Sequence, residues 1–402
     1  MSNIKYNITR VLFYLFSITL ALGTWNPFVP FQSEMEERTG FDLAQIIAVF
    51  FIISLFFVNK AKKKKKDPYA IMLSVFFVVI IISTLINSLS SLSSGTTVYL
   101  VKFALELLLC VLLPRFLVTS PRLLYQSAFI FSIVCSVLAI MYTLGYLDPF
   151  LMISKGRIFF WGENPNSTSA RYGIAFLFIL HFVILNPLGF GKWRHILWMP
   201  LPFILNLIMA TGSRGSFLIL LISILAYLAY VPFKSRLHKA FFAFVVPIGI
   251  YFIIGYIDKT NQDYSLFQRL TATVESGEDA GRRELNREAI QIFKDKPLLG
   301  VGVQRFQNEM ILRFNEERTV HNLYLYILAV SGIVGLICFG LFLFHLSKDS
   351  YAIRKGTSLA ITLLIYVFFL AYKTGGALTY MLMWYVFGVI ISLYKIHSSR
   401  SY

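Results

Sequence analysis

The chain has 402 residues, of which 57% are hydrophobic and only 14% carry a charge, and its mean hydropathy is +0.69. Soluble globular domains carry roughly a quarter charged residues, so this composition excludes a soluble enzyme, a nucleic-acid-binding domain and a secreted disulfide scaffold. Apolar runs of about 20 residues recur along the whole chain, and each is long enough to cross the roughly 30 Å hydrocarbon core as a helix. The sequence therefore predicts an all-α polytopic membrane protein.

The apolar runs indicate about 12 transmembrane helices, which would place both termini on the same side of the membrane. The expected spans are residues 11–30, 41–59, 69–88, 97–114, 123–144, 167–186, 196–211, 215–233, 240–257, 321–346, 357–373 and 378–396.

The net charge of +17 comes from 37 Lys and Arg against 20 Asp and Glu. Lys and Arg are concentrated in every second short loop, most densely in the lysine run between Lys60 and Lys66. Because cytoplasmic loops carry this excess, the pattern predicts that both termini are cytoplasmic and that loops of the opposite parity lie outside. The charge is therefore explained by topology, and no nucleic-acid partner is expected.

A fold-back is expected inside the segment 196–233, whose only charge is Arg214. As one straight helix this segment would be roughly 57 Å long, almost twice the bilayer core. The turn-forming residues lie at 210–216, and loop parity places them at the outer face. An arginine there is costly unless it is paired or hydrated, and the small residues around Arg214 leave room for a ligand. The alternative is a turn arginine that extends its side chain to water.

A long outer loop is expected at 258–320, with a helix of its own from about Gly281 to Lys294 that Asp279 can cap and Pro297 ends. At 100° per residue, Arg282 lies at the centre of the apolar face of this helix. It also lies in the first turn, where free N–H groups favour an anion. The alternative is that Arg282 folds back to water. The apolar face consists of Leu285, Ala289, Ile292 and Phe293, whereas Arg283, Arg287 and Lys294 project away from it.

Two further outer segments carry candidate residues. His321, followed by Asn322, ends the long loop, and histidine is the side chain most easily poised as a base near neutral pH. The alternative is an interfacial histidine that hydrogen-bonds Asn322 or a carbonyl. In the other segment, Arg157 precedes a turn at 162–166, after which Asn166 or Ser167 is expected to cap the next helix.

Sequence templates for phosphate loops, dinucleotide sites and metal sites are absent, so we expect no cofactor and no metal. Lys102 and Glu106 are four residues apart within one span and could pair along a helix face. Charges inside the membrane can mark transport, but a self-neutralising pair is more often structural.

In their order and spacing, these motifs resemble the O-antigen ligase/polymerase superfamily, multi-spanning enzymes that transfer lipid-linked glycans. The resemblance covers roughly residues 155–345. It rests on Asn-Pro-Asn at 164–166, Thr-Gly-Ser-Arg-Gly at 211–215, Gly-Arg at 281–282 ahead of Pro-Leu-Leu-Gly-Val-Gly at 297–302, and His-Asn-Leu-Tyr at 321–324. The family often has Trp where this chain has Asn286.

The resemblance implies a glycan donor on undecaprenyl diphosphate and a sugar hydroxyl, on a glycan or on lipid A core, as acceptor. It implies that Arg214 and Arg282 hold the diphosphate and that His321 is needed for transfer. We further assign substrate binding to three outer residues, Arg157, Asn166 and Asn322.

The resulting hypothesis is a metal-independent, inverting glycosyltransferase of the bacterial cytoplasmic membrane, active at its outer face as a surface polysaccharide polymerase. The alternatives are an O-antigen ligase and, from another class, a flippase for the same lipid-linked glycan. The other expected partners are membrane lipids and polysaccharide assembly proteins. We divide the chain into N-terminal spans (1–150), a catalytic region (155–345, including the loop 258–320) and C-terminal helices with a cytoplasmic tail (346–402).

Overall fold

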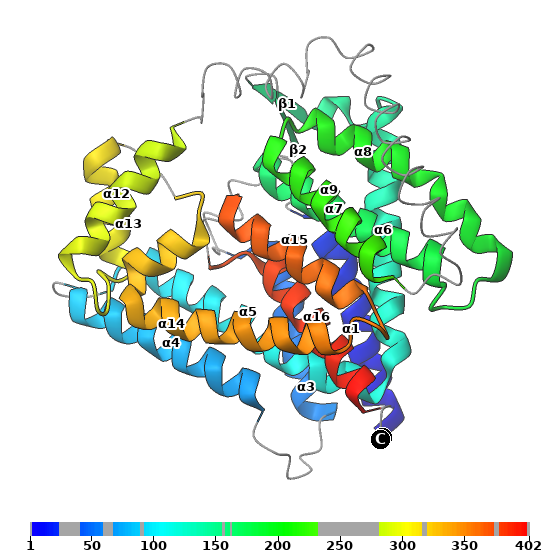
Figure 1. The fold of residues 1–402 in the computed structure, drawn as a ribbon, viewed down its shortest axis with the longest axis horizontal. Coiled ribbons are helices and arrows are strands. Elements are labelled where there is room, and N and C mark those ends of the chain that lie inside the picture. Colours follow the sequence, from blue (N-terminus) through cyan, green and yellow to red (C-terminus); the bar gives the residue numbers. More distant parts are fainter. Residues whose placement is uncertain are drawn as a thin grey trace.

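The computed structural model describes a helical bundle with one small β-hairpin (Figure 1). The predicted all-α polytopic class is confirmed, with the hairpin β1–β2 as an addition in the outer segment where a loop was expected. The described residues are 2–23, 41–58, 67–88, 92–154, 157–160, 163–231, 281–315, 320–373 and 378–399.

The helices are α1 (Ser2–Leu22), α3 (Leu43–Val58), α4 (Pro68–Asn87), α5 (Ser94–Thr119), α6 (Pro121–Thr143), α7 (Pro165–Leu185), α8 (Pro200–Ala210), α9 (Arg214–Tyr230), α12 (Arg282–Asp295), α13 (Val303–Phe314), α14 (Leu323–Ala352), α15 (Leu359–Lys373) and α16 (Met381–Ser398). Two 3₁₀ helices (Asp148–Phe150 and Gly191–Trp198) and the antiparallel strands β1 (Leu151–Ser154) and β2 (Arg157–Phe160) complete the described elements.

The expected count of about 12 spans is not confirmed. Among the described residues, six helices are long and apolar enough to cross a membrane, namely α4, α5, α6, α7, α14 and α16. The helices α3, α9 and α15 are apolar but shorter, and α8 has 11 residues, or about 16 Å of helix. The expected fold-back at 210–216 is present, because α8 ends at Ala210 and α9 begins at Arg214. The expected span 240–257 lies outside the described residues.

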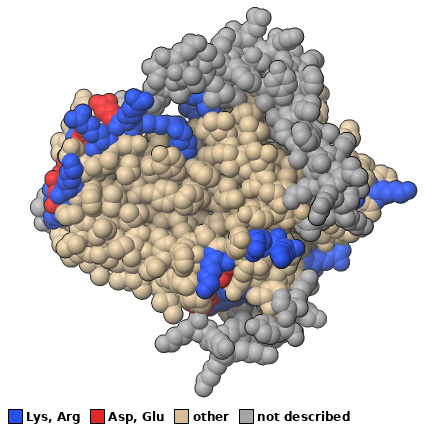
Figure 2. Space-filling model, in the orientation of Figure 1, with Lys and Arg blue, Asp and Glu red and all other residues tan. Residues whose placement is uncertain are grey.

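The bundle has two chemically distinct ends. At one end Tyr6 of α1 hydrogen-bonds Ser120, and Lys395 of α16 pairs with Asp67, which caps α4. The end of α16 and the start of α1 lie towards the same edge of the view in Figure 1. On the face drawn in Figure 2, the described Lys and Arg lie towards the two ends, and the belt between them is almost uncharged. This arrangement suits a protein whose middle is surrounded by lipid.

Helix α14 is broken at Gly332, which has φ 65° and ψ −166°. A break in a transmembrane helix frees backbone N–H and C=O groups that lipid cannot satisfy. The segment that follows α12 satisfies them: Ile333 N–H donates to Pro297 O (2.9 Å), and Val301 N–H donates to Ala329 O (2.9 Å). A Cβ at Gly332 would lie 2.2 Å from the Leu298 carbonyl oxygen. The two backbones therefore approach too closely for a side chain.

The segment 297–302 is also fixed to α4. Asn87 Nδ2 donates to Gly300 O (3.1 Å), and Val303 N–H donates to Thr84 Oγ1 (3.2 Å). Helix α12 ends at Asp295, immediately before this segment, and α13 begins immediately after it. The docked segment therefore sets where α12, which carries Arg282, packs on α14 and where α13 packs on α4 (Figure 1).

We expect Gly332→Ala to destabilise the protein. This combination of φ and ψ is essentially restricted to glycine and costs another residue about 1–3 kcal/mol, and the contact with Leu298 adds to that cost. The thermal midpoint of the purified protein should fall by several degrees. Gly340 is the matched control, because it lies in the same helix with no atom within 4 Å of an added Cβ. Gly340→Ala should leave the midpoint unchanged or raise it slightly, and equal midpoints for both variants would contradict the role of the break.

Candidate functional site

Arg157, the first residue of β2, joins three segments at one end of the bundle. Its Nη2 donates to Asn166 Oδ1 (2.9 Å), and its Nε donates to the carbonyl oxygen of Thr211 (3.2 Å). Ser213 Oγ donates to the same Asn166 oxygen (2.9 Å). Asn166 is buried in the first turn of α7. The hairpin, the start of α7 and the turn between α8 and α9 are therefore tied together through Asn166.

The expected cap of α7 was wrong. Asn164, rather than Asn166 or Ser167, caps the helix, and its Oδ1 accepts the Asn166 N–H at 2.9 Å. The physical reason is that Pro165 occupies the first helical position, where its missing N–H costs nothing. The residue before that proline is therefore the cap, and the side chain of Asn166 is left to bind Arg157.

Arg214 is the first residue of α9 and is half-buried. The preceding turn is tight: Gly212 has φ 61°, and the Thr211 and Ser213 side chains are buried. Gly215, the next residue, lies against the aliphatic part of Lys373, the last residue of α15. A Cβ at Gly215 would be 2.8 Å from Lys373 Cγ. The turn that carries Arg214 is thus in contact with the end of α15.

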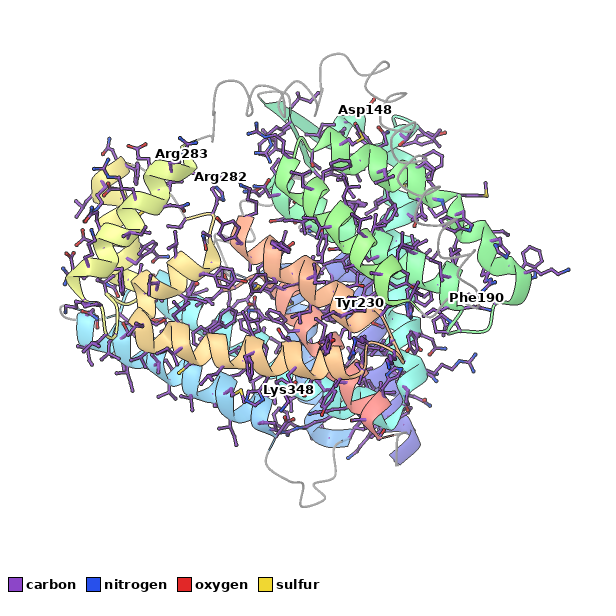
Figure 3. All side chains as sticks on the ribbon, in the orientation of Figure 1. Asp148, Phe190, Tyr230, Arg282, Arg283 and Lys348 are labelled. Atoms are coloured by element: carbon purple, nitrogen blue, oxygen red, sulfur yellow. The ribbon has the colours of Figure 1, made fainter. Side chains whose placement is uncertain are left out.

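Arg282 lies on the inward face of α12, as the helical periodicity predicted. Its Nη1 donates to the carbonyl oxygen of Lys373 (3.1 Å). Figure 3 labels Arg282 and Arg283 at the start of α12. The expected helix from Gly281 to Lys294 is observed as Arg282–Asp295, and the expected cap Asp279 lies outside the described residues. Leu285, Ala289 and Ile292 are buried and Phe293 is half-buried, whereas Arg283, Arg287 and Lys294 are exposed.

His321 immediately precedes the capped start of α14 and is half-buried. Burial, together with the positive charges of Arg282 and Arg157, lowers its pKa to about 4. At neutral pH His321 is uncharged and can accept a proton.

Asn322 serves the fold of this region. Its Oδ1 accepts the N–H groups of Tyr324 (3.0 Å) and Leu325 (3.2 Å) and so caps α14. This hydrogen bonding fixes the chain direction next to His321. The oxygen that was assigned to substrate binding is therefore engaged in capping the helix.

The predicted residues belong to one connected site. Arg157 contacts Asn166 and the turn of Arg214, this turn contacts Lys373, and Lys373 holds Arg282. The charges of Arg282 and Arg157 both act on His321. In the sequence, Lys373 was considered only as one of the positive charges in the short loops between spans. Its position directly before the Thr-Gly-Gly stretch at 374–376 in the sequence, a composition typical of turns, was a signal that could have found it.

A buried ion pair that the sequence analysis missed supports the start of α7. Arg171 pairs with Glu163, whose other oxygen accepts the Thr168 hydroxyl at 2.9 Å. The Arg171 guanidinium lies against Gly23, where a Cβ would overlap it. Breaking a buried pair typically costs about 3–5 kcal/mol. Glu163 precedes the Asn-Pro-Asn motif, so this pair anchors the motif to α7 and to the end of α1.

Two other expectations concern charges and metals. Lys102 and Glu106 do not pair: Lys102 Nζ lies 5.7 Å from the centre of the Phe41 ring, and within the described residues no hydrogen bond reaches the buried carboxylate of Glu106. Four residues of helix bring side chains near each other, but the packing of neighbouring helices directs these two elsewhere. Across the described part of the chain, no group of three or more His, Cys, Asp or Glu could hold a metal ion.

Comparison with known proteins gives one match. The family model described as O-antigen ligase matches residues 200–340. This range contains Arg214, Arg282 and His321, and leaves Arg157 and Lys373 outside. Searches of curated proteins and of solved structures found no match. The match over residues 200–340 supports the resemblance of this chain to the O-antigen ligase/polymerase superfamily.

Proposed function

We propose that the protein transfers a glycan from undecaprenyl diphosphate to a sugar hydroxyl at the outer face of the bacterial cytoplasmic membrane. The observation that carries this proposal is the set of contacts that joins Arg157, the Arg214 turn and Arg282 through Lys373, whose arginine charges help to lower the pKa of His321. The loop charges favour the outer face for this end of the bundle. The family match supports glycosyl transfer in general.

The arginines suit the leaving group of this reaction. When the bond between the anomeric carbon and the diphosphate oxygen breaks, the electron pair and negative charge go to the diphosphate. Fixed guanidinium groups in a site of low dielectric constant stabilise such charge strongly. On this proposal Arg214 and Arg282 bind the diphosphate, Arg157 adds positive charge, and no metal is required.

His321 is suited to take the proton from the acceptor hydroxyl. The acceptor hydroxyl oxygen forms a bond to the anomeric carbon, and its proton passes to a ring nitrogen of His321. Attack from the side opposite the diphosphate inverts the anomeric configuration. The diphosphate also helps the base, because its negative charge offsets the arginines that lower the pKa of His321. Donor binding would thus make the histidine a stronger base.

The choice of acceptor separates two versions of this function. We favour a polymerase, in which a growing glycan is the acceptor, because of the Asn-Pro-Asn motif at 164–166. The ligase version, with lipid A core as acceptor, is supported by the description of the matching family model. Both versions use the same donor and the same cationic site.

A flippase for the same donor is the candidate from another class. Transporters of this type place polar groups and broken helices near the bilayer midplane. Here the arginines and the histidine gather at one end of the bundle. The break in α14 is filled by the chain's own segment 297–302, so it does not present a midplane binding site.

Arginine substitutions test the site. Arg282→Ala should lower kcat by about a hundredfold or more, because removing one charge-stabilising group in a fixed site has an effect of this size. Arg214→Ala and His321→Ala should also abolish transfer, at normal abundance in the membrane. Arg283→Ala and Arg287→Ala are the matched controls on the exposed side of α12 and should be mild. An essential Arg287 beside a dispensable Arg282 would refute the assignment.

The pH dependence of kcat/KM tests His321. This ratio reports the free enzyme, in which the pKa of His321 is about 4. Activity should therefore be retained well below pH 6 and fall as the pH drops through about 4. In Arg157→Gln this fall should begin at higher pH, because a positive charge that opposed protonation is gone. An acid limb that Arg157→Gln leaves unchanged would argue against His321 as the base.

Complementation of a strain that lacks the gene tests the reaction itself. A glycan ladder on a gel distinguishes the versions: single-repeat products in the mutant strain indicate a polymerase, whereas free lipid-linked polymer with bare core indicates a ligase. If the mutant strain retains the donor on the cytoplasmic side of the membrane, the flippase is correct and the transferase proposal fails.

A further inference from the structure

Lys373 contacts both arginine-bearing parts of the site. Its carbonyl oxygen accepts the hydrogen bond from Arg282 Nη1 at 3.1 Å. Its aliphatic stem crosses Gly215, with Cγ 2.8 Å from the position of an added Cβ. Gly215 directly follows Arg214. Lys373 is therefore the residue through which the end of α15 joins the Arg214 turn to the start of α12.

The ammonium group of Lys373 has no ion-pair partner within the described residues, where no carboxylate oxygen lies within 4.0 Å of it. The side chain is exposed. The described hydrogen bonds of the neighbouring arginines end on neutral oxygens: the Lys373 carbonyl for Arg282, and the Thr211 carbonyl and Asn166 amide oxygen for Arg157. These bonds orient the guanidinium groups.

We propose that Lys373 is a further diphosphate-binding residue, whose ammonium group contacts the donor between Arg214 and Arg282. This inference rests on the proposed function. Lysine is a compact charge on a flexible stem, whereas arginine offers a rigid fork. Lys373 can therefore follow the diphosphate oxygens as the negative charge on them grows, while the arginines hold the group in place.

The competing explanation is that Lys373 acts only on its own helix, because a cation in the last turn stabilises the helix dipole. That role would affect the stability of α15 and leave diphosphate binding unchanged. The two explanations therefore predict different measurements on the same variant.

Lys373→Met is the decisive variant, because it removes the charge but keeps the stem on Gly215 and the carbonyl that holds Arg282. The full-length protein in nanodiscs should bind undecaprenyl diphosphate about tenfold more weakly as Lys373→Met, with a smaller loss for undecaprenyl monophosphate. Lys373→Arg should restore most of the affinity. Lys294→Met, on the exposed face of α12, is the control and should bind like the wild type.

Gly215→Ala provides a second test, because the added methyl group displaces the lysine stem and keeps its charge. It should weaken diphosphate binding in the wild-type background and have little further effect in the Lys373→Met background. An equal effect in both backgrounds would mean that Gly215 acts independently of Lys373, and the inference would be wrong.

The outcomes separate this inference from the proposed function. If the wild type transfers glycan and binds the diphosphate, and Lys373→Met binds equally well, only the role of Lys373 is refuted. A lower thermal midpoint with unchanged binding would assign Lys373 to the helix end and also refute it. If the wild type neither transfers glycan nor binds the diphosphate, the proposed function fails and this inference fails with it.

Discussion

The rest of the site depends on the break in α14 at Gly332 and on the segment 297–302 that fills it. A helix broken inside a membrane needs new partners for its backbone groups, and here the outer loop supplies them through backbone hydrogen bonds. The same hydrogen bonds hold the segment that follows α12, and so they fix the position of α12 on the bundle. The part of α14 that precedes the break begins directly after His321 and Asn322. One structural device therefore positions Arg282 and His321 relative to each other.

The arginines at this end of the bundle belong to two kinds. Arg171 is buried against the carboxylate of Glu163, so its charge is neutralised within the protein and its role is structural. Arg157 and Arg282 are oriented by the neutral oxygens of Asn166, Thr211 and Lys373, and their charge still lowers the pKa of His321. Guanidinium groups held in a fixed orientation suit the binding of a diphosphate.

Sequence reasoning could predict what local periodicity determines. The choice of Arg282 over Arg283 and Arg287 followed from the 3.6-residue repeat of α12, and the fold-back before Arg214 followed from helix length. Contacts between distant segments carry no such signal: Arg157 meets Thr211, 54 residues away, and Arg282 meets Lys373, 91 residues away. The break in α14 was also hidden, because Gly332 stands within an apolar run that suits an unbroken helix.

The site is assembled from two parts of the chain, residues 157–216 and residues 282–373. Lys373 links them at the site, because its stem lies against Gly215 of the first part while its carbonyl oxygen accepts the hydrogen bond of Arg282 within the second. On the proposed function, a diphosphate between Arg214 and Arg282 would add charged contacts to both parts at once. Because the arginines lower the pKa of His321, the bound anion would also make the base stronger. Donor binding would thus complete the site mechanically and electrostatically before the acceptor reacts.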